Sequence, residues 1–230
     1  MNQTKPLVSI QNLSVYQRGN LVLSQVNIAI NKGEFVYLIG KTGSGKSSLM
    51  QMLYAGLPIK EGEIEFAESK ISTLSEKEIP FLRRKLGIVF QDFQLLTDRN
   101  IQENLFFVMK ATGWTDKNQM LSRVKEVLEK VGLGTKGMMM PFQLSGGEQQ
   151  RLAIARALVN HPLMVIADEP TGNLDPSTSE EIVALLKEIS AGGTTVLMAT
   201  HDYSLFKKFP SRTLSCESGK VQDSASISSL

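Results

Sequence analysis

Hydrophobic and polar residues alternate along the first thirty positions of the chain. The alternation covers residues 7–17 and 21–30, and in the second stretch the apolar side chains at 26, 28 and 30 fall on one face. A period of two residues is typical of a strand with one buried face. Because Arg18-Gly19-Asn20 favours a turn between the two stretches, we expect the chain to open with an antiparallel hairpin.

The remainder of the chain mixes short apolar runs with stretches of helical period. Predicted strands lie at 34–39, 86–90, 163–167 and 194–199. Those at 34–39 and 163–167 are apolar enough to be buried on both faces of a sheet. Predicted helices lie at 46–54, 101–110, 118–131, 148–160 and 179–189. Strands that alternate with helices predict an α/β fold with a parallel sheet.

Length and charge narrow the class of protein. The 230 residues are enough for one large domain, or a domain with a subdomain, whose core needs no disulfide. A net charge of +2 gives no support to a nucleic-acid surface, and the single cysteine, Cys216, excludes an internal disulfide. No signal peptide and no apolar run near the ~20 residues of a membrane span are found. We therefore expect a soluble protein that meets a membrane only through a partner.

A glycine-rich segment between a predicted strand and a predicted helix carries the first candidate chemistry. It reads Gly40-Lys41-Thr42-Gly43-Ser44-Gly45-Lys46-Ser47, followed by Ser48, and fits the phosphate-binding pattern G-x-x-x-x-G-K-[ST]. Its backbone N–H groups and the start of the helix would surround phosphates. Lys46 would reach the β- and γ-phosphates, and the Ser47 hydroxyl would bind Mg²⁺. The alternative is a flexible Gly-Ser turn.

Two consecutive carboxylates follow the predicted strand at 163–167. In a parallel sheet the carboxyl end of such a strand opens onto the ligand crevice. Asp168 is therefore a candidate Mg²⁺ ligand, and Glu169 is a candidate general base that polarises the attacking water. The alternative is a solvated acidic turn.

A third motif separates this chain from other phosphate-loop proteins. Residues 144–151 read Leu-Ser-Gly-Gly-Glu-Gln-Gln-Arg, in which Ser145 is also a good helix N-cap. The run resembles the LSGGQ signature of the ATP-binding cassette (ABC) family, and the order of phosphate loop, signature and carboxylate pair is that of the family. The resemblance implies that Ser145, Gly146, Gly147 and Glu148 bind the γ-phosphate held by a second copy.

The resemblance implies four further roles. Gln91 matches the Q-loop glutamine, which would sense Mg²⁺ and the attacking water. Asp175 matches the D-loop, which crosses the interface between two copies. His201 matches the switch histidine that contacts the γ-phosphate, although a lone histidine is also a common capping or surface residue. Tyr16 lies where the family stacks an aromatic ring on adenine; otherwise it is a strand residue packed on its sheet.

The family fold and activity are then expected for this chain. The fold would be a P-loop NTPase (RecA-like) core with an N-terminal antiparallel β subdomain and an inserted α-helical subdomain. We expect one ABC ATPase domain, with the core at 1–90 and 151–222, helices at about 91–150, and a frayed tail at 223–230. The activity would be hydrolysis of ATP to ADP and phosphate, with ATP and Mg²⁺ bound between two copies that close on ATP.

Two segments indicate a branch of the family. Asp168-Glu-Pro-Thr-Gly-Asn-Leu-Asp175 resembles the branch that holds cell-division, lipoprotein-release and macrolide-export ATPases. Phe90-Gln-Asp-Phe-Gln-Leu-Leu-Thr-Asp-Arg99 is most similar to the cell-division ATPases, although Thr97 stands where proline is expected. That similarity implies an FtsX-like membrane permease as partner, a peripheral location on the cytoplasmic face of the bacterial inner membrane, and control of cell-wall hydrolysis during division.

Other readings stay open at this point. The chain could serve a lipoprotein-release or macrolide-type exporter, which would share all of the chemistry and differ in the partner. A soluble regulatory ATPase and a nucleic-acid-binding protein are further alternatives. The partner surface is expected within 92–110, where Phe106 and Phe107 add apolar side chains, unless these simply form the core of the helical segment.

Overall fold

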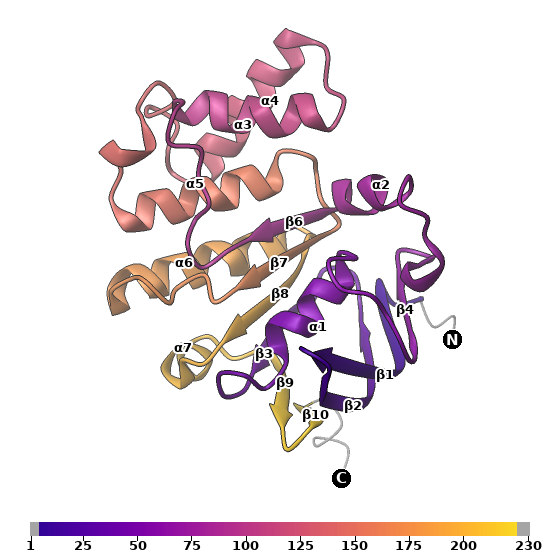
Figure 1. The fold of residues 1–230 in the computed structure, drawn as a ribbon. Helices are drawn as coiled ribbons and strands as arrows, with labels where there is room; N and C mark the ends of the chain where they lie inside the picture. Colours follow the sequence, from indigo (N-terminus) through magenta and orange to yellow (C-terminus); the bar gives the residue numbers. More distant parts are fainter. Residues whose placement is uncertain (1–4, 225–230) are drawn as a thin grey trace.

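The computed structural model describes residues 5–224, which fold around two sheets (Figure 1). The smaller sheet has the strand order β2-β1-β4-β5. Its strands are β1 (Val8–Gln17), β2 (Asn20–Ile30), β4 (Glu63–Phe66) and β5 (Ser69–Lys70). β1 pairs antiparallel with β2 and with β4, so the predicted opening hairpin is confirmed.

The larger sheet has the strand order β10-β9-β3-β8-β7-β6. Its strands are β3 (Phe35–Ile39), β6 (Leu86–Val89), β7 (Met164–Asp168), β8 (Thr195–Thr200), β9 (Arg212–Glu217) and β10 (Lys220–Asp223). Neighbours from β9 to β6 are parallel, and β10 is antiparallel to β9. The predicted α/β fold with a parallel sheet is confirmed.

Helices cover both faces of the larger sheet. They are α1 (Lys46–Leu53), α2 (Ile79–Arg84), α3 (Ile101–Ala111), α4 (Lys117–Lys130), α5 (Gly146–Leu158), α6 (Pro176–Ala191) and α7 (Tyr203–Lys208), with 3₁₀ turns η1 (Ile71–Thr73) and η2 (Pro141–Gln143). Figure 1 shows α1 between the two sheets and α5 and α6 on the opposite face of the larger one. No described helix is long and apolar enough to cross a bilayer.

The central strands of the larger sheet are buried on both faces. In β3 the side chains of Phe35 and Tyr37 join an apolar cluster with α5 and α6, whereas Val36 and Leu38 join a second cluster with α1 and the smaller sheet. Successive strand residues point to opposite faces, so a strand covered on both sides has to be apolar throughout. This burial explains the unbroken apolar runs in the sequence and holds the carboxyl ends of β3 and β7 at one edge.

The helical segment beyond β6 shares its core with the sheet. Buried side chains of α3 and α4 belong to the same apolar cluster as α5, α6 and one face of the larger sheet. Helix α5 spans 146–158, so the predicted boundary between residues 150 and 151 falls inside one helix. The helix that carries the signature motif therefore connects the helical segment rigidly to the core.

The structure contains several short strands and helices that the sequence did not predict. Strands β4, β5, β9 and β10 and helices α2 and α7 are short and lack a clear period. The predicted frayed tail is wrong at its first residue, because Asp223 ends β10, pairs with Leu214 and accepts from Arg212 Nη2 at 2.6 Å. Residues 225–230 of that tail lie outside the described part of the chain.

A buried asparagine organises the connection from β6 to α3. Asn104 is 1% exposed, and its Nδ2 donates to the carbonyl oxygens of Leu96, Arg99 and Asn100 at 2.9, 3.1 and 3.0 Å. Its Oδ1 accepts from the Leu96 N–H at 2.8 Å. One side chain thus satisfies the backbone of a loop that has no ladder of its own.

We predict that Asn104→Ala lowers the free energy of unfolding by about 2–3 kcal/mol, because it leaves buried backbone groups without partners. For a chain of this size that corresponds to a fall in Tm of roughly 5–10 °C. Thermal and urea unfolding measure the change. Asn118→Ala, at an exposed position in α4, is the matched control; equal losses in the two variants would contradict the assignment.

Candidate active site

The glycine-rich segment forms a tight loop between the end of β3 and the start of α1. Gly40 has a φ of +150°, and a Cβ there would lie 2.6 Å from the carbonyl oxygen of Cys216. Gly45 precedes α1 with a φ of +95°, in the left-handed region that side chains rarely adopt. Glycine at these positions lets the loop bring its N–H groups and the N-terminus of α1 close to an anion.

The Lys46 ammonium lies inside this loop. The residue is 5% exposed, and its Nζ donates to the carbonyl oxygens of Gly40 at 2.7 Å and Lys41 at 3.3 Å. Glu169 Oε1 is 3.7 Å from the same nitrogen. Carbonyl dipoles and one carboxylate therefore hold a desolvated cation in the loop, where an incoming phosphate would bring further negative charge.

Asp168 and Glu169 occupy the carboxyl edge of the sheet from which the phosphate loop also leaves. Burial raises the pKa of the Asp168 carboxyl, and a hydrogen bond from Ser47 lowers it by less. The Asp168 Oδ1 atom is buried without a hydrogen-bond partner among the described residues. A buried, unsatisfied carboxylate oxygen beside a serine hydroxyl fits the oxygen ligands that Mg²⁺ prefers.

Glu169 is held between two cationic or proton-bearing side chains. It has a left-handed φ of +48°, and its backbone N–H donates to Ala199 O at 3.1 Å. Its Oε2 is 2.5 Å from His201 Nδ1, while its Oε1 faces Lys46. The imidazole of His201, at 58% exposure, thus orients the carboxylate from the solvent side.

A small cavity brings together most residues predicted to bind phosphate. It is lined by Gln17, Thr42, Gly43, Gly45, Lys46, Ser47, Ser48 and Glu169. Gln17 was not expected from the sequence, although it follows Tyr16 directly. Tyr16 itself does not line the cavity. Its hydroxyl donates to Glu61 at 2.9 Å and Lys60 Nζ lies 5.3 Å from its ring centroid, so Lys60 covers one face of the ring.

Gln91 follows β6 and does not line the phosphate cavity. Its side chain lies against Gly172, where a Cβ would come 2.8 Å from Gln91 Nε2. The backbone oxygen of Gln91 accepts from Asn173 Nδ2 at 3.2 Å. The structure therefore places Gln91 beside the segment that joins Glu169 to Asp175, and its predicted role toward Mg²⁺ stays a prediction.

The signature motif lines a separate depression. Ser145 caps α5 by accepting from the Glu148 N–H, and the Glu148 side chain accepts from the Ser145 N–H in return. Ser145, Gly146, Gly147 and Glu148 face the residues that surround Asp175. Asp175 caps α6, and its bonds from Ser177 and Thr178 lower the pKa of its carboxyl. This depression shares no lining residue with the phosphate cavity.

Glu148 stands where the family signature has an uncharged glutamine. A carboxylate at this point would repel a γ-phosphate. Lys136 Nζ contacts the Glu148 carboxylate, and this bond together with the Ser145 N–H lowers the pKa of Glu148. Lys136 therefore offsets the extra negative charge at the N-terminus of α5, a contact that the sequence does not reveal.

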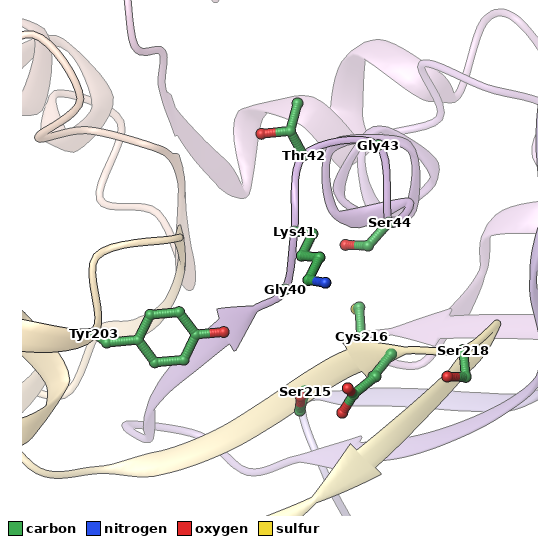
Figure 2. Close-up of a pocket in the computed structure, with 10 residues that line it drawn as sticks. Gly40, Lys41, Thr42, Gly43, Ser44, Tyr203, Ser215, Cys216 and Ser218 are labelled. Atoms are coloured by element: carbon green, nitrogen blue, oxygen red, sulfur yellow. The ribbon is translucent and has the colours of Figure 1, made fainter.

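The outer side of the phosphate loop borders a further cavity (Figure 2). Figure 2 shows the side chains of Lys41 and Ser44 pointing into it from the loop, Tyr203 pointing into it from the start of α7, and Cys216 at its floor. Burial raises the pKa of the Cys216 thiol to about 11, so this thiol stays protonated at neutral pH. The loop is thus backed by β9 on one side and faces the phosphate cavity on the other.

These features define a class of protein. A family model described as "ABC transporter" matches residues 23–172, and the chain belongs to this family. It is an ATP-binding protein and an ATP hydrolase of the ABC type.

The most informative similarities are to cell division proteins. The chain is 44% identical to the "Cell division ATP-binding protein FtsE" of Streptococcus pneumoniae serotype 2, over 90% of this chain and 89% of the relative. It is 46% identical to the protein of the same name from Bacillus subtilis, over 90% of each. A dimeric structure of the ATP-binding cassette MJ0796 bound to ADP and Pi superposes with a TM-score of 0.79 at 36% identity, covering 94% of this chain and 96% of that one.

We predict that Lys46→Ala weakens ATP binding about ten- to a hundredfold, because a charge-assisted bond to phosphate contributes about 1.5–3 kcal/mol. Titration calorimetry with ATP measures the change. Lys32→Ala, which removes an exposed lysine just before β3, is the control and should bind ATP normally. An unchanged affinity of the Lys46 variant would contradict the role given to the ammonium group.

Proposed function

We propose that the chain is the ATP-hydrolysing subunit of an FtsX-type membrane complex that acts in cell division. In this complex, ATP-driven dimerisation would be transmitted across the membrane to control cell-wall hydrolysis. One observation carries the ATPase part: Glu169 is held between Lys46 and His201 beside the phosphate loop. The cell division part is supported by the similarity to FtsE proteins. The chain would then sit on the cytoplasmic face of the bacterial inner membrane, held there by its partner.

ATP would bind with its phosphates in the loop of residues 40–48 and its adenine near Tyr16. The loop N–H groups, the N-terminus of α1 and Lys46 supply positive charge to the phosphates. Ser47 and Asp168 would hold Mg²⁺, with Gln91 reaching it when the segment after β6 moves. The metal ion would neutralise phosphate charge, and its site is supported by the Asp168 oxygen that has no hydrogen-bond partner within residues 5–224.

Glu169 is the proposed general base. Its carboxylate would accept a hydrogen bond from the attacking water and draw off the proton as the water meets the γ-phosphate. The contact with His201 Nδ1 at 2.5 Å fixes the direction of the carboxylate, and the exposed imidazole would contact the γ-phosphate. Lys46 Nζ, 3.7 Å from Oε1, places a positive charge between the carboxylate and the phosphates.

A complete site would need two copies of the chain. In one chain the signature residues 145–148 and the phosphate loop line different cavities. A head-to-tail dimer would place Ser145, Gly146, Gly147 and Glu148 of one copy, with Asp175 nearby, over the phosphates bound by the other. The γ-phosphate would then bridge the two copies, so ATP would favour the closed pair and ADP would not.

We predict that Glu169→Gln keeps ATP affinity within about threefold but stops hydrolysis, so that ATP traps the dimer. Size-exclusion chromatography with light scattering, with ATP or ADP in the buffer, measures the mass. Glu129→Gln, on the exposed side of α4, is the control and should return to monomer as ATP is consumed. If Glu169→Gln binds ATP and stays monomeric, the proposed ATP-dependent dimer is wrong.

The partner surface is proposed on the outer side of α3. Phe106 packs against the core, but Phe107 is 49% exposed and Met138 is 75% exposed. Both line a groove of about 860 Å³, together with the charged residues Asp98, Arg99, Glu103, Lys110 and Lys117. Two exposed apolar side chains among charges of both signs fit a short amphipathic helix. The proposed occupant is a cytoplasmic helix of the membrane permease.

We predict that Phe107→Asp abolishes recovery of the permease and leaves ATP binding by the isolated chain unchanged, because it replaces an apolar contact of the groove with a charge. The measurement is a tagged pull-down from detergent-solubilised membranes with ATP, in the Glu169→Gln background. Leu121→Asp, at an exposed position of α4, is the matched control. If the chain with Phe107 intact instead recovers a lipoprotein-release or efflux permease, the proposed ATPase mechanism stands and the proposed cell division role is wrong.

A further inference from the structure

The backbone after Gln91 is held in an unfavourable conformation. Phe93 and Gln94 both have left-handed φ angles, +57° and +48°, and the Gln94 N–H donates to Asp92 O at 2.6 Å. A left-handed φ is unfavourable for any residue other than glycine. The turn therefore persists only because other parts of the molecule hold it.

Arg156 of α5 holds this turn. Its Nη2 donates to the Phe93 carbonyl oxygen at 2.8 Å, and its Nη1 contacts that of Gln94. Burial lowers the pKa of the guanidinium. Among the described residues Asp92 is the carboxylate whose charge acts on it, without a hydrogen bond. Two carbonyl dipoles are thus the main compensation for a desolvated cation, and they lie on one short loop.

The same loop is held from a second side. Asn173, between Glu169 and Asp175, donates to the carbonyl oxygen of Gln91. Helix α5 itself begins at the signature motif, and Arg156 lies eleven residues after Ser145, about 16 Å along a rigid helix. Any displacement of the helix N-terminus is therefore passed to Arg156, because the helix does not compress.

We propose that Arg156 is a positioning residue that couples the signature end of α5 to the Gln91–Gln94 turn and so sets where Gln91 stands during hydrolysis. This inference rests on the proposed ATPase mechanism and extends it. When the signature end of α5 meets the phosphates of a second copy, the guanidinium pulls the turn, and Gln91 shifts relative to Ser47 and Asp168. The planar fork of arginine suits two neighbouring carbonyls, and a lysine ammonium does not reproduce it.

An arginine on the neighbouring helix supplies a matched comparison. Arg123 of α4 donates to the carbonyl oxygens of Leu158 and Val159 at 2.5 and 3.1 Å. It too contacts two carbonyls, but it also pairs with Glu126 and joins helices that share one core. Loss of Arg123 should lower stability without a specific effect on turnover.

The experiment compares Arg156→Lys, Arg156→Ala and Arg123→Lys in the full chain with Mg·ATP. We expect Arg156→Lys to lower kcat about ten- to a hundredfold while KM and the affinity for ATP stay within about twofold. Arg156 also lines a surface cavity of about 350 Å³. Millimolar guanidinium should therefore restore much of the kcat of Arg156→Ala, and equimolar methylammonium should not.

Hydrogen–deuterium exchange of the nucleotide-free chain tests the contact between Arg156 and the turn without measuring ATP hydrolysis. Arg156→Lys should speed exchange in peptides that cover residues 91–96 at least fivefold and leave the signature peptide unchanged. Unchanged exchange there, an unchanged kcat, or a kcat that falls only in step with Tm as in Arg123→Lys would each overturn the inference. An inactive parent chain would instead contradict the proposed mechanism, and the exchange result would still decide whether Arg156 holds the turn.

Discussion

Burial of strand β3 on both faces is the constraint on which the site depends. Its side chains point alternately into two apolar clusters, one with α5 and α6 and one with α1 and the smaller sheet. Because β3 and β7 lie parallel in the same sheet, their carboxyl ends open at one edge. The phosphate loop follows the carboxyl end of β3, and Asp168 lies at the carboxyl end of β7. Packing of the sheet therefore brings the phosphate-binding loop and the carboxylates together.

The charged groups at this edge of the sheet are buried or half-buried and only partly satisfied by hydrogen bonds and ion pairs. Lys46 is buried among carbonyl oxygens, and Glu169 lies between that lysine and His201. Asp168 has a buried oxygen with no hydrogen-bond partner in the described part of the chain. Buried groups that are only partly satisfied cost stability. In the proposed mechanism, phosphate and Mg²⁺ supply the missing partners of these polar groups. The stability that the nucleotide-free fold lacks for want of them would then be gained on binding.

A single chain holds two half-sites that face different cavities. The signature end of α5 is a capped helix N-terminus with its acidic residue offset by Lys136, and it lies apart from the phosphate loop. Helix α5 nevertheless reaches from that end to the turn after Gln91 through Arg156. In the proposed mechanism, closure of two copies would therefore displace Gln91 and, through α3, the groove beside Phe107.

The sequence by itself determined the strand and helix types of the core, the loop of residues 40–48, the signature at 144–151 and the carboxylate pair. These depend on residue periods and on motifs closed within a few positions, so local pattern suffices. Only the tertiary structure decided that β9 and β10 extend the sheet, that Asp223 is paired rather than frayed, and that Gln17 rather than Tyr16 lines the phosphate cavity. It alone joined Glu169 to His201, Glu148 to Lys136 and Arg156 to Phe93, because side chains far apart in the chain meet only where helices and strands pack.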